Sequence, residues 1–206
     1  MERFGFVGLP NAGKSSLFNA LAGGGALAAP YAFATTDPNV GVVKVPDQRL
    51  DALAEMSESR KVVNSTTEFV DIGGLVEGAS QGEGLGNKFL AGIREVDALV
   101  LVLRTFDDED VPGPTDPIEH LRVVEIELTL ADLESVEGRI DRRRKALRAD
   151  PRDAVLVAEV DALEEALTLL SEGTPLYQSD LSDERRSALR EHFLLTNKPV
   201  MAVLNI

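Results

Sequence analysis

The chain has 206 residues, of which 44% are hydrophobic and 27% charged, a composition typical of a folded globular protein. It contains no cysteine and two histidines, which excludes disulfide frameworks, cysteine-bound metal clusters, thiol nucleophiles and histidine-rich metal sites. Acidic residues number 35 against 21 basic ones, and the net charge of -14 should repel nucleic acid and anionic membranes at long range. Any contact with RNA therefore needs a local basic patch.

The hydrophobic segments of the chain are short. Its longest unbroken apolar run, residues 98–103, falls far short of the ~20 residues that a membrane-spanning helix needs. The first residues also lack the pattern of a signal peptide. We therefore expect a cytoplasmic protein that makes no membrane contact.

Apolar runs, glycine-containing loops and helical patterns alternate in the first half of the chain. Runs rich in β-branched and aromatic residues predict strands at 4–7, 40–45, 68–72 and 98–104. Helical patterns lie between them, at 15–21, 48–56 and 85–95. This alternation predicts an α/β fold in which a mostly parallel sheet has helices on both faces.

From residue 117 onward the pattern becomes helical. Apolar residues recur every seven positions from Ile126 to Leu147, and at spacings of four and three from Leu156 to Leu170. Because the breaker Asp150-Pro151 separates the two series, they predict an inserted antiparallel α-helical coiled-coil hairpin. A helix over 182–193, capped by its first serine, and a strand over 199–204 should then return the chain to the sheet.

Residues 8–15 read Gly-Leu-Pro-Asn-Ala-Gly-Lys-Ser and fill every fixed position of the phosphate-loop pattern. Gly8 and Gly13 let the backbone turn and approach a ligand closely. Lys14 supplies a cation for the β- and γ-phosphates, and the Ser15 hydroxyl can bind Mg²⁺. Backbone N–H groups of the loop and of the next helix should converge on the phosphates. The expected nucleotide-binding residues here are Asn11, Ala12, Gly13, Lys14, Ser15 and Ser16.

A hydrolytic phosphate loop also needs a second acid near its metal ion. Asp71 ends a predicted strand and is placed to hold Mg²⁺ through water, although a simple strand-end turn would have the same sequence. Gly74 would let a backbone N–H face the γ-phosphate. Lys14 and Gly74 are therefore the expected catalytic residues. Thr35 and Thr36 lie in the connection after the first helix, and spacing alone does not decide which of them binds the metal.

Taken together, these segments resemble the YchF-type (Obg-like ATPase) branch of the Obg-related translation-factor GTPases. The resemblance covers the whole chain, including the helical hairpin before the last strand. It implies that Thr35 is the switch threonine that binds Mg²⁺. The matching segments are residues 8–15, 31–41, 71–80 and 82–90.

The resemblance also implies slow turnover. Leu75 falls where Ras-like enzymes carry a water-orienting glutamine, and a leucine side chain has no group that could align water. Some members of the family carry a histidine in the loop after the fourth strand. The corresponding loop here, 105–116, contains none, and His120 lies beyond it, so we expect no catalytic role for His120.

Asn205 falls on the first residue of the family's Asn-x-x-Glu base-recognition motif. That motif replaces the Asn-Lys-x-Asp of true GTPases, so the resemblance implies a preference for ATP, with GTP also bound. The family's remaining sheet elements and C-terminal ubiquitin-like domain are not in this sequence, and we expect an N-terminal fragment. Its expected parts are the first part of the nucleotide-binding domain (1–116), the inserted hairpin (117–194) and a return strand (195–206).

Asn11 carries a further hypothesis. In potassium-activated relatives an asparagine at this loop position helps to bind K⁺, which neutralises charge in the transition state. Bound K⁺ would partly compensate for Leu75. If Asn11 is simply a polar loop residue, hydrolysis should be indifferent to K⁺.

Residues 139–148 place six basic residues near the expected hairpin tip of this acidic chain. Such a run is typical of a solvated helix face. Because members of the resembled family associate with the ribosome, the sharper expectation is an RNA-contacting tip that uses Arg142, Arg143 and Arg144. Binding through phosphate contacts would fall steeply with salt.

These expectations combine in a monomeric, Mg²⁺-dependent nucleoside triphosphatase that prefers ATP, changes conformation with the γ-phosphate and acts at the ribosome. Two alternatives stay open. A nucleotide-gated binding module would hold a partner in its ATP state with negligible turnover. A GTP-specific Obg-like ribosome assembly factor would differ in its base pocket.

Overall fold

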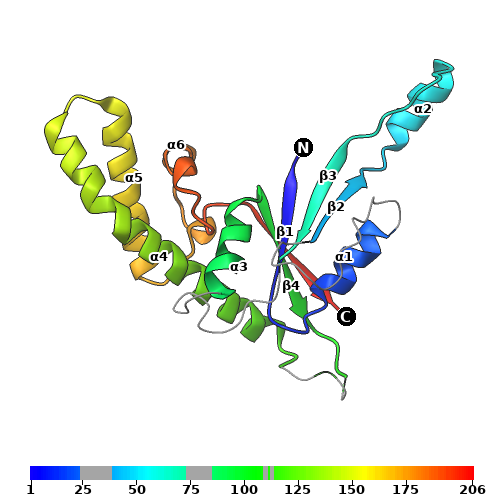
Figure 1. Cartoon of the computed structure of the whole chain (residues 1–206), viewed down its shortest axis with the longest axis horizontal. Helices are drawn as coiled ribbons and strands as arrows, with labels where there is room; N and C mark the ends of the chain where they lie inside the picture. Colours follow the sequence, from blue (N-terminus) through cyan, green and yellow to red (C-terminus); the bar gives the residue numbers. More distant parts are fainter. Residues whose placement is uncertain (24–38, 73–84, 109–110, 112–113) are drawn as a thin grey trace.

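A computed structural model describes residues 1–23, 39–72, 85–108, 111 and 114–206, apart from the side chains of 85–89. Its strands are β1 (Arg3–Val7), β2 (Asn39–Lys44), β3 (Thr66–Asp71), β4 (Ala98–Arg104) and β5 (Val200–Asn205). They form one sheet in the order β2-β3-β1-β4-β5 (Figure 1). β2 pairs antiparallel with β3, and the other pairs are parallel. The predicted α/β fold with a mostly parallel sheet is therefore confirmed.

The helices begin where the sequence supplies caps. Asp47, Asp116 and Asp153 each accept a backbone hydrogen bond in the first turn of α2, α4 and α5. Within the described ranges, no helix is both long and apolar enough to span a bilayer. The helices are α1 (Lys14–Ala22), α2 (Gln48–Met56), α3 (Leu85–Arg94), α4 (Pro117–Ala149), α5 (Ala154–Ser171) and α6 (Asp183–Ala188), with short 3-10 turns η1 (Leu176–Gln178) and η2 (Arg190–His192).

β4 is apolar up to its last residue because helices cover both faces of the sheet. Leu99, Leu101 and Leu103 lie in the core that the sheet forms with α3 and α4. Val100 and Val102 lie in a second core, which contains residues of α1. Successive side chains of a strand point to opposite faces, so one continuous apolar run serves both cores.

α4 has two different packing partners along its length. Its first half places Val124 and Leu128 in the core of the sheet. Its second half packs Val136 and Ile140 against α5. The prediction of one seven-residue seam is therefore wrong at its start, because Ile126 is 57% exposed where α4 turns its buried face toward the sheet.

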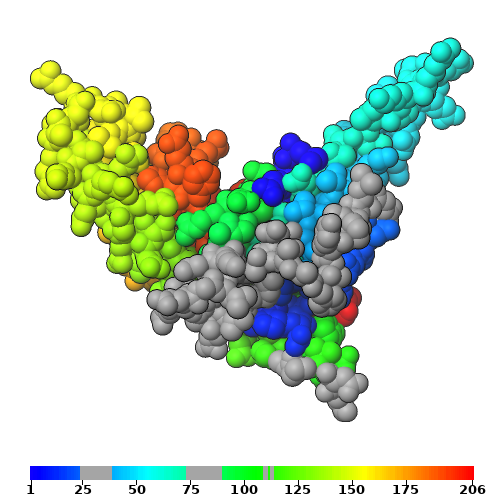
Figure 2. All heavy atoms as spheres, viewed as in Figure 1, coloured from blue at the N-terminus to red at the C-terminus, as the bar shows by residue number. Residues whose placement is uncertain are grey.

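α4 and α5 lie side by side and project from the sheet (Figure 1). The turn between them contains Asp150 and Pro151, as the sequence predicts. Figure 2 shows this pair and an arm formed by α2 with the adjoining ends of β2 and β3 as two separate projections. Coiled-coil packing along the whole α4–α5 pair stays a prediction.

The prediction of one helix over residues 182–193 is wrong. Ser182 does cap α6, since its hydroxyl accepts a hydrogen bond of 3.3 Å from the Arg185 N–H. The chain then continues as η2, and Phe193 has a φ of 53°, which ends the helical run. Leu189 and Leu194 both reach the core around α5, whereas one continuous helix would point them roughly 140° apart.

Candidate nucleotide-binding site

Residues 8–15 join β1 to α1 at the carboxyl ends of the parallel strands. A β-carbon on Gly8 would lie 2.5 Å from the carbonyl oxygen of Val102, so only glycine lets the loop pass this close to β4. Gly13 has a φ of 92°, in the left-handed region that favours glycine, and directly precedes α1. The loop therefore meets the N-terminus of α1, where backbone N–H groups are available to an anion.

Lys14 is the first residue of α1 and is 6% exposed. Its Nζ donates a hydrogen bond of 2.8 Å to the carbonyl oxygen of Leu9, on the other side of the loop. Burial lowers the pKa of Lys14, and the negative charge of Asp71 opposes that fall. A phosphate oxygen would offer this ammonium group a charged acceptor in place of a neutral carbonyl.

Asp71 ends β3, next to β1 in the sheet, and is 9% exposed. Its Oδ1 is buried and has no hydrogen-bond partner among the described residues. A buried carboxylate oxygen of this kind is costly unless a water molecule or a metal ion completes it. Ser15 is an exposed residue at the start of α1. Both residues supply the oxygen donors that Mg²⁺ prefers, so they fit a magnesium ion.

Asn205 ends β5 and reaches the same loop from the far end of the chain. Its Nδ2 donates a hydrogen bond of 3.0 Å to the carbonyl oxygen of Ala12. A β-carbon on Gly13 would lie 2.1 Å from that nitrogen, so the amide occupies space that only glycine leaves open. The structure thus brings Asn205 together with the phosphate loop across 193 residues of sequence.

The other residues expected from the sequence are less fully described. Asn11, with a φ of 63°, and Ser16 are both exposed on the loop and on α1. The expected metal ligand, the expected catalytic glycine and the residue in place of the water-orienting glutamine lie outside the described residues, so their roles stay predictions. These residues are Thr35 (with its neighbour Thr36), Gly74 and Leu75.

Arg104 lies at this edge of the sheet and was not expected from the sequence. It ends β4, pairs in register with Asn205 and is 1% exposed. Its guanidinium lies 4.5 Å from the centre of the Phe106 ring, and its Nε donates a hydrogen bond of 3.1 Å to the Phe106 carbonyl oxygen. Arg104 thereby holds the start of the loop after β4. A charged residue ending an otherwise apolar strand is the signal that could have identified it.

The three arginines expected to contact RNA have different environments. Arg143 Nε lies 2.6 Å from Glu159 Oε1, and Arg144 Nε lies 2.9 Å from Glu164 Oε1. Both carboxylates belong to α5. Arg142 is exposed and has no ion pair within the part of the chain that the structure describes. Part of the basic run therefore joins α4 to α5.

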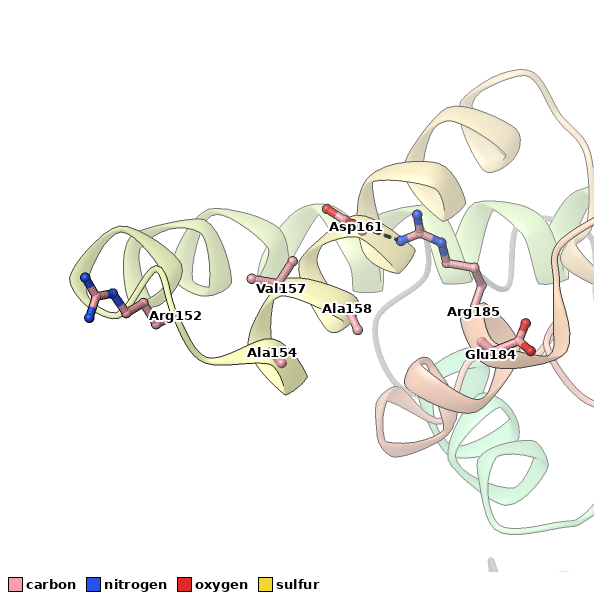
Figure 3. Close-up of a pocket in the computed structure, with 7 residues that line it drawn as sticks. All are labelled: Arg152, Ala154, Val157, Ala158, Asp161, Glu184 and Arg185. Carbon is pink, nitrogen blue, oxygen red and sulfur yellow. Dashed lines mark ion pairs between the residues drawn. The ribbon is translucent and has the colours of Figure 1, made fainter.

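A groove of about 460 Å³ lies between α5 and α6 (Figure 3). Arg185 extends toward Asp161 across its wall, at 3.5 Å. These two charges neutralise each other, and the groove lies on the helical projection rather than at the phosphate loop. We therefore assign the candidate site to the edge of the sheet formed by the carboxyl ends of its parallel strands, where residues 8–15 lie.

Comparisons with known proteins agree with this assignment. Residues 3–134 match the family described as "50S ribosome-binding GTPase". "Ribosome-binding ATPase YchF" of Bacillus subtilis is 45% identical over 98% of this chain and 56% of its own length, and the protein of the same name from Pasteurella multocida is 47% identical with the same coverage. The solved structure of the Schizosaccharomyces pombe YchF GTPase covers 99% of this chain and is 36% identical, with a TM-score of 0.77.

The chain spans 56% of the length of these relatives. Over that part the resemblance is continuous, from the phosphate loop through the helical projection to β5. The chain therefore belongs to this GTPase family and, within it, to the YchF branch.

Proposed function

We propose that the chain binds a Mg²⁺–nucleoside triphosphate on residues 8–15 and hydrolyses the bond between its β- and γ-phosphates. The observation that carries this proposal is a phosphate-loop sequence between a strand and a helix, with Lys14 and Asp71 buried beside it. The names of the relatives, ATPase and GTPase, support nucleotide hydrolysis by the whole protein.

Lys14 and the backbone N–H groups of the loop would bind the phosphates. As a triphosphate enters, Lys14 Nζ would exchange the Leu9 carbonyl for β- and γ-phosphate oxygens, and the N-terminus of α1 would favour the same negative charge. Ser15, Thr35 and, through water, Asp71 would hold the metal ion. Bound Mg²⁺ supplies neutralisation of the charge that develops on the phosphate oxygens.

Hydrolysis by this chain alone should be slow. Gly74 would donate its backbone N–H to the γ-phosphate, but Leu75 offers no group that orients water. Asn11 would help to bind K⁺, which would supply part of the missing charge stabilisation. Hydrolysis in KCl should then exceed hydrolysis in NaCl at equal ionic strength, and equal rates would remove this part of the proposal.

ATP is the nucleotide that we expect to bind best, with GTP bound more weakly. The support is the name ATPase that several relatives carry. The position of Asn205 at the end of β5 supports a base pocket there for either nucleotide, since both base-recognition motifs begin with asparagine. Competition between ATP and GTP for a fluorescent nucleotide tests it. A clear preference for GTP would favour the GTP-specific assembly factor instead.

The ribosome is the partner that the family description and the relatives' names support. Within the helical projection, three exposed cations lie three positions apart on one face of α4 and have no ion pair among the described residues: Arg142, Lys145 and Arg148. We expect these to contact RNA phosphates. Arg143 and Arg144 would contribute less than the sequence suggests, because α5 already neutralises them.

In this proposal residues 1–116 and 195–206 form the nucleotide-binding domain and 117–194 form the inserted helical projection. The projection would report to the ribosome while the sheet edge binds nucleotide. We further expect the chain to act as a monomer in the cytoplasm, and size-exclusion chromatography with light scattering tests the first of these statements.

Single-turnover hydrolysis separates an enzyme from a nucleotide-gated module. We expect slow hydrolysis of ATP that requires Mg²⁺ and accelerates with ribosomes. Nucleotide-dependent ribosome binding with negligible hydrolysis under both conditions would favour the gated module and contradict the enzymatic proposal.

A second experiment tests the ribosome contact. Replacing all three exposed cations of α4 by glutamate should abolish most co-sedimentation with ribosomes and lower its dependence on salt. A matched control makes the same change in net charge on the α2 arm and should sediment as the unmodified chain does. Equal behaviour of the two variants would contradict a contact at the tip. The variants are R142E/K145E/R148E and, as control, K44E/R60E/K61E.

A further inference from the structure

Asp132 lies on α4, and its side chain is 0% exposed. It accepts hydrogen bonds of 2.8 Å from the Leu195 N–H, 2.7 Å from the Thr196 N–H and 2.7 Å from the Thr196 hydroxyl. All three donors belong to the segment 194–199, which leads from the helical projection into β5. The carboxylate therefore joins α4 directly to the chain that enters the last strand.

Burying a carboxylate is costly, and the donors that surround Asp132 offset that cost. Burial raises the pKa of Asp132, whereas the hydrogen bonds from Thr196 and Leu195 and the nearby charge of Arg94 lower it. An apolar residue at this position would avoid the cost of desolvation but could not bind two successive backbone N–H groups. The arrangement thus fixes the position of the backbone at residues 195 and 196.

The same segment is held from two other elements. Lys198 Nζ donates hydrogen bonds to the carbonyl oxygens of Arg94, at 3.0 Å, and Val96, at 2.5 Å, where α3 leads into β4. Asn197 Nδ2 donates to the carbonyl oxygen of Arg186 on α6, at 3.0 Å. The segment 194–199 is therefore a junction between α3, α4, α6 and β5.

β5 carries the position of this junction to the phosphate loop. It pairs with β4 without interruption, from Val200 opposite Leu99 to Asn205 opposite Arg104. An extended strand advances about 3.3 Å per residue and cannot lengthen further, so the start of β5 fixes the position of its end. A shift of the register by one residue would also turn Asn205 to the other face of the sheet. The contact between Asn205 and Ala12 therefore requires that β5 begins at one defined place.

We infer that Asp132 is a positioning residue for the nucleotide site, because it sets where β5 begins and so holds Asn205 on the phosphate loop. The inference rests on the proposed function, since the effect is to be measured on nucleotide binding. It assigns to α4 a mechanical link with the loop 8–15, which runs from Asp132 through β5 to Asn205.

The test is a double-mutant cycle between Asp132 and Asn205, read by calorimetric titration with MgADP. Asp132→Asn replaces one acceptor oxygen by an amide that faces a backbone donor, and we expect about a fivefold to tenfold weaker affinity. Asn205→Ala should weaken binding by about as much. If Asp132 acts through Asn205, the double variant should bind as weakly as Asn205→Ala alone, whereas independent effects would multiply.

A control on the same helix separates positioning from general destabilisation. Glu125 accepts hydrogen bonds from the Tyr177 hydroxyl, at 2.9 Å, and from Gln178, at 2.5 Å, so it ties α4 to η1 and away from β5. Glu125→Gln should leave the affinity for MgADP within about twofold of the unmodified chain. Thr196→Val removes one of the three donors at constant shape. It carries the test, with a smaller expected loss, should Asp132→Asn fail to fold.

The side-chain amide signals of Asn205 provide a reading that needs no nucleotide. In the nucleotide-free protein they should move in Thr196→Val and Asp132→Asn, and stay in place in Glu125→Gln. Multiplying effects in the cycle, or unmoved Asn205 signals, would overturn the inference. An unmodified chain that binds no nucleotide would instead contradict the proposed function, while the amide signals would still decide whether Asp132 positions Asn205.

Discussion

The edge of the sheet and the helical projection both collect charged residues, but they treat them in opposite ways. At the sheet edge Lys14 and Asp71 are buried, and Lys14 donates to a neutral carbonyl while one Asp71 oxygen has no partner among the described residues. On the projection Arg143 and Arg144 face carboxylates of α5. The first arrangement leaves polar atoms for a ligand to complete, as the proposed function requires, whereas the second is already paired within the chain. A cluster of charged residues therefore indicates a ligand-binding site only where the chain itself does not already pair those charges.

The apolar contacts of the projection provide the largest expected effect on stability. Ile140 is buried against α5, whereas Ile126, from the same seven-residue repeat, is exposed. Ile140→Ala should lower the free energy of unfolding by about 2–5 kcal/mol. Ile126→Ala should lower it by less than about 0.5 kcal/mol. Urea denaturation of both variants checks this, and equal losses would restore the continuous seam that the repeat predicts.

Gly13, directly before α1, provides a test at the phosphate loop, the first of the two regions compared. Gly13→Ala would place a β-carbon 2.1 Å from Asn205 Nδ2, at a φ of 92°. We expect nucleotide affinity to fall by about 100-fold, because the added β-carbon would displace Asn205 or the loop from the arrangement that binds phosphate. Calorimetric titration with MgADP measures it.

Gly173 supplies the matched control for that substitution. It also has a positive φ, of 79°, but no atom lies within 4 Å of an added β-carbon. Gly173→Ala should therefore lower stability and leave nucleotide affinity unchanged. If both alanine variants bind nucleotide equally well, contact between Gly13 and Asn205 has no part in the site.

The smallest expected effect concerns His192, a titratable residue that is buried in the helical projection. His192 Nε2 lies 2.8 Å from Glu159 Oε1. Burial lowers the pKa of His192 below its ordinary value of 6.5, and Glu159 opposes the fall. The unfolded chain therefore takes up the proton first as the pH drops, so the folded state loses stability as pH falls through about 6.5 and below.

His192→Gln removes this titration. The fall in melting temperature between about pH 7.5 and about pH 5.5 should be smaller in the variant than in the unmodified chain, by a few degrees at most. The remaining fall, from other groups, serves as the baseline. Parallel curves for the two proteins would show that protonation of His192 does not oppose folding.

Local pattern was sufficient for most of the fold. β4 follows the apolar run 98–103 and ends one residue later, and the caps of α2, α4 and α5 lie where an aspartate precedes a helical pattern. The seven-residue repeat could not say whether Ile126 faces α5 or solvent, because periodicity defines a face but not its partner. The break before η2 depends on which leucines must reach the core, and that is a property of tertiary packing.

The candidate site likewise has a part that local sequence predicts and a part that depends on tertiary structure. Residues 8–15 could be predicted because one contiguous motif defines the phosphate loop. The contact of Asn205 with Ala12 depends on the register of β5, and the burial of Asp132 depends on donors more than 60 residues away. A polar residue on a helix is ordinarily read as solvent-facing, so no local signal distinguishes Asp132.

The central claim is that residues 8–15 bind the phosphates of a nucleotide, and calorimetric titration of Lys14→Ala with MgATP tests it most directly. Lys145→Ala, which removes an exposed lysine of the projection, is the control. We expect at least about a 100-fold loss of affinity for Lys14→Ala and none for the control, since Lys14 is the buried cation of the loop. Equal affinities for the two variants would contradict the account.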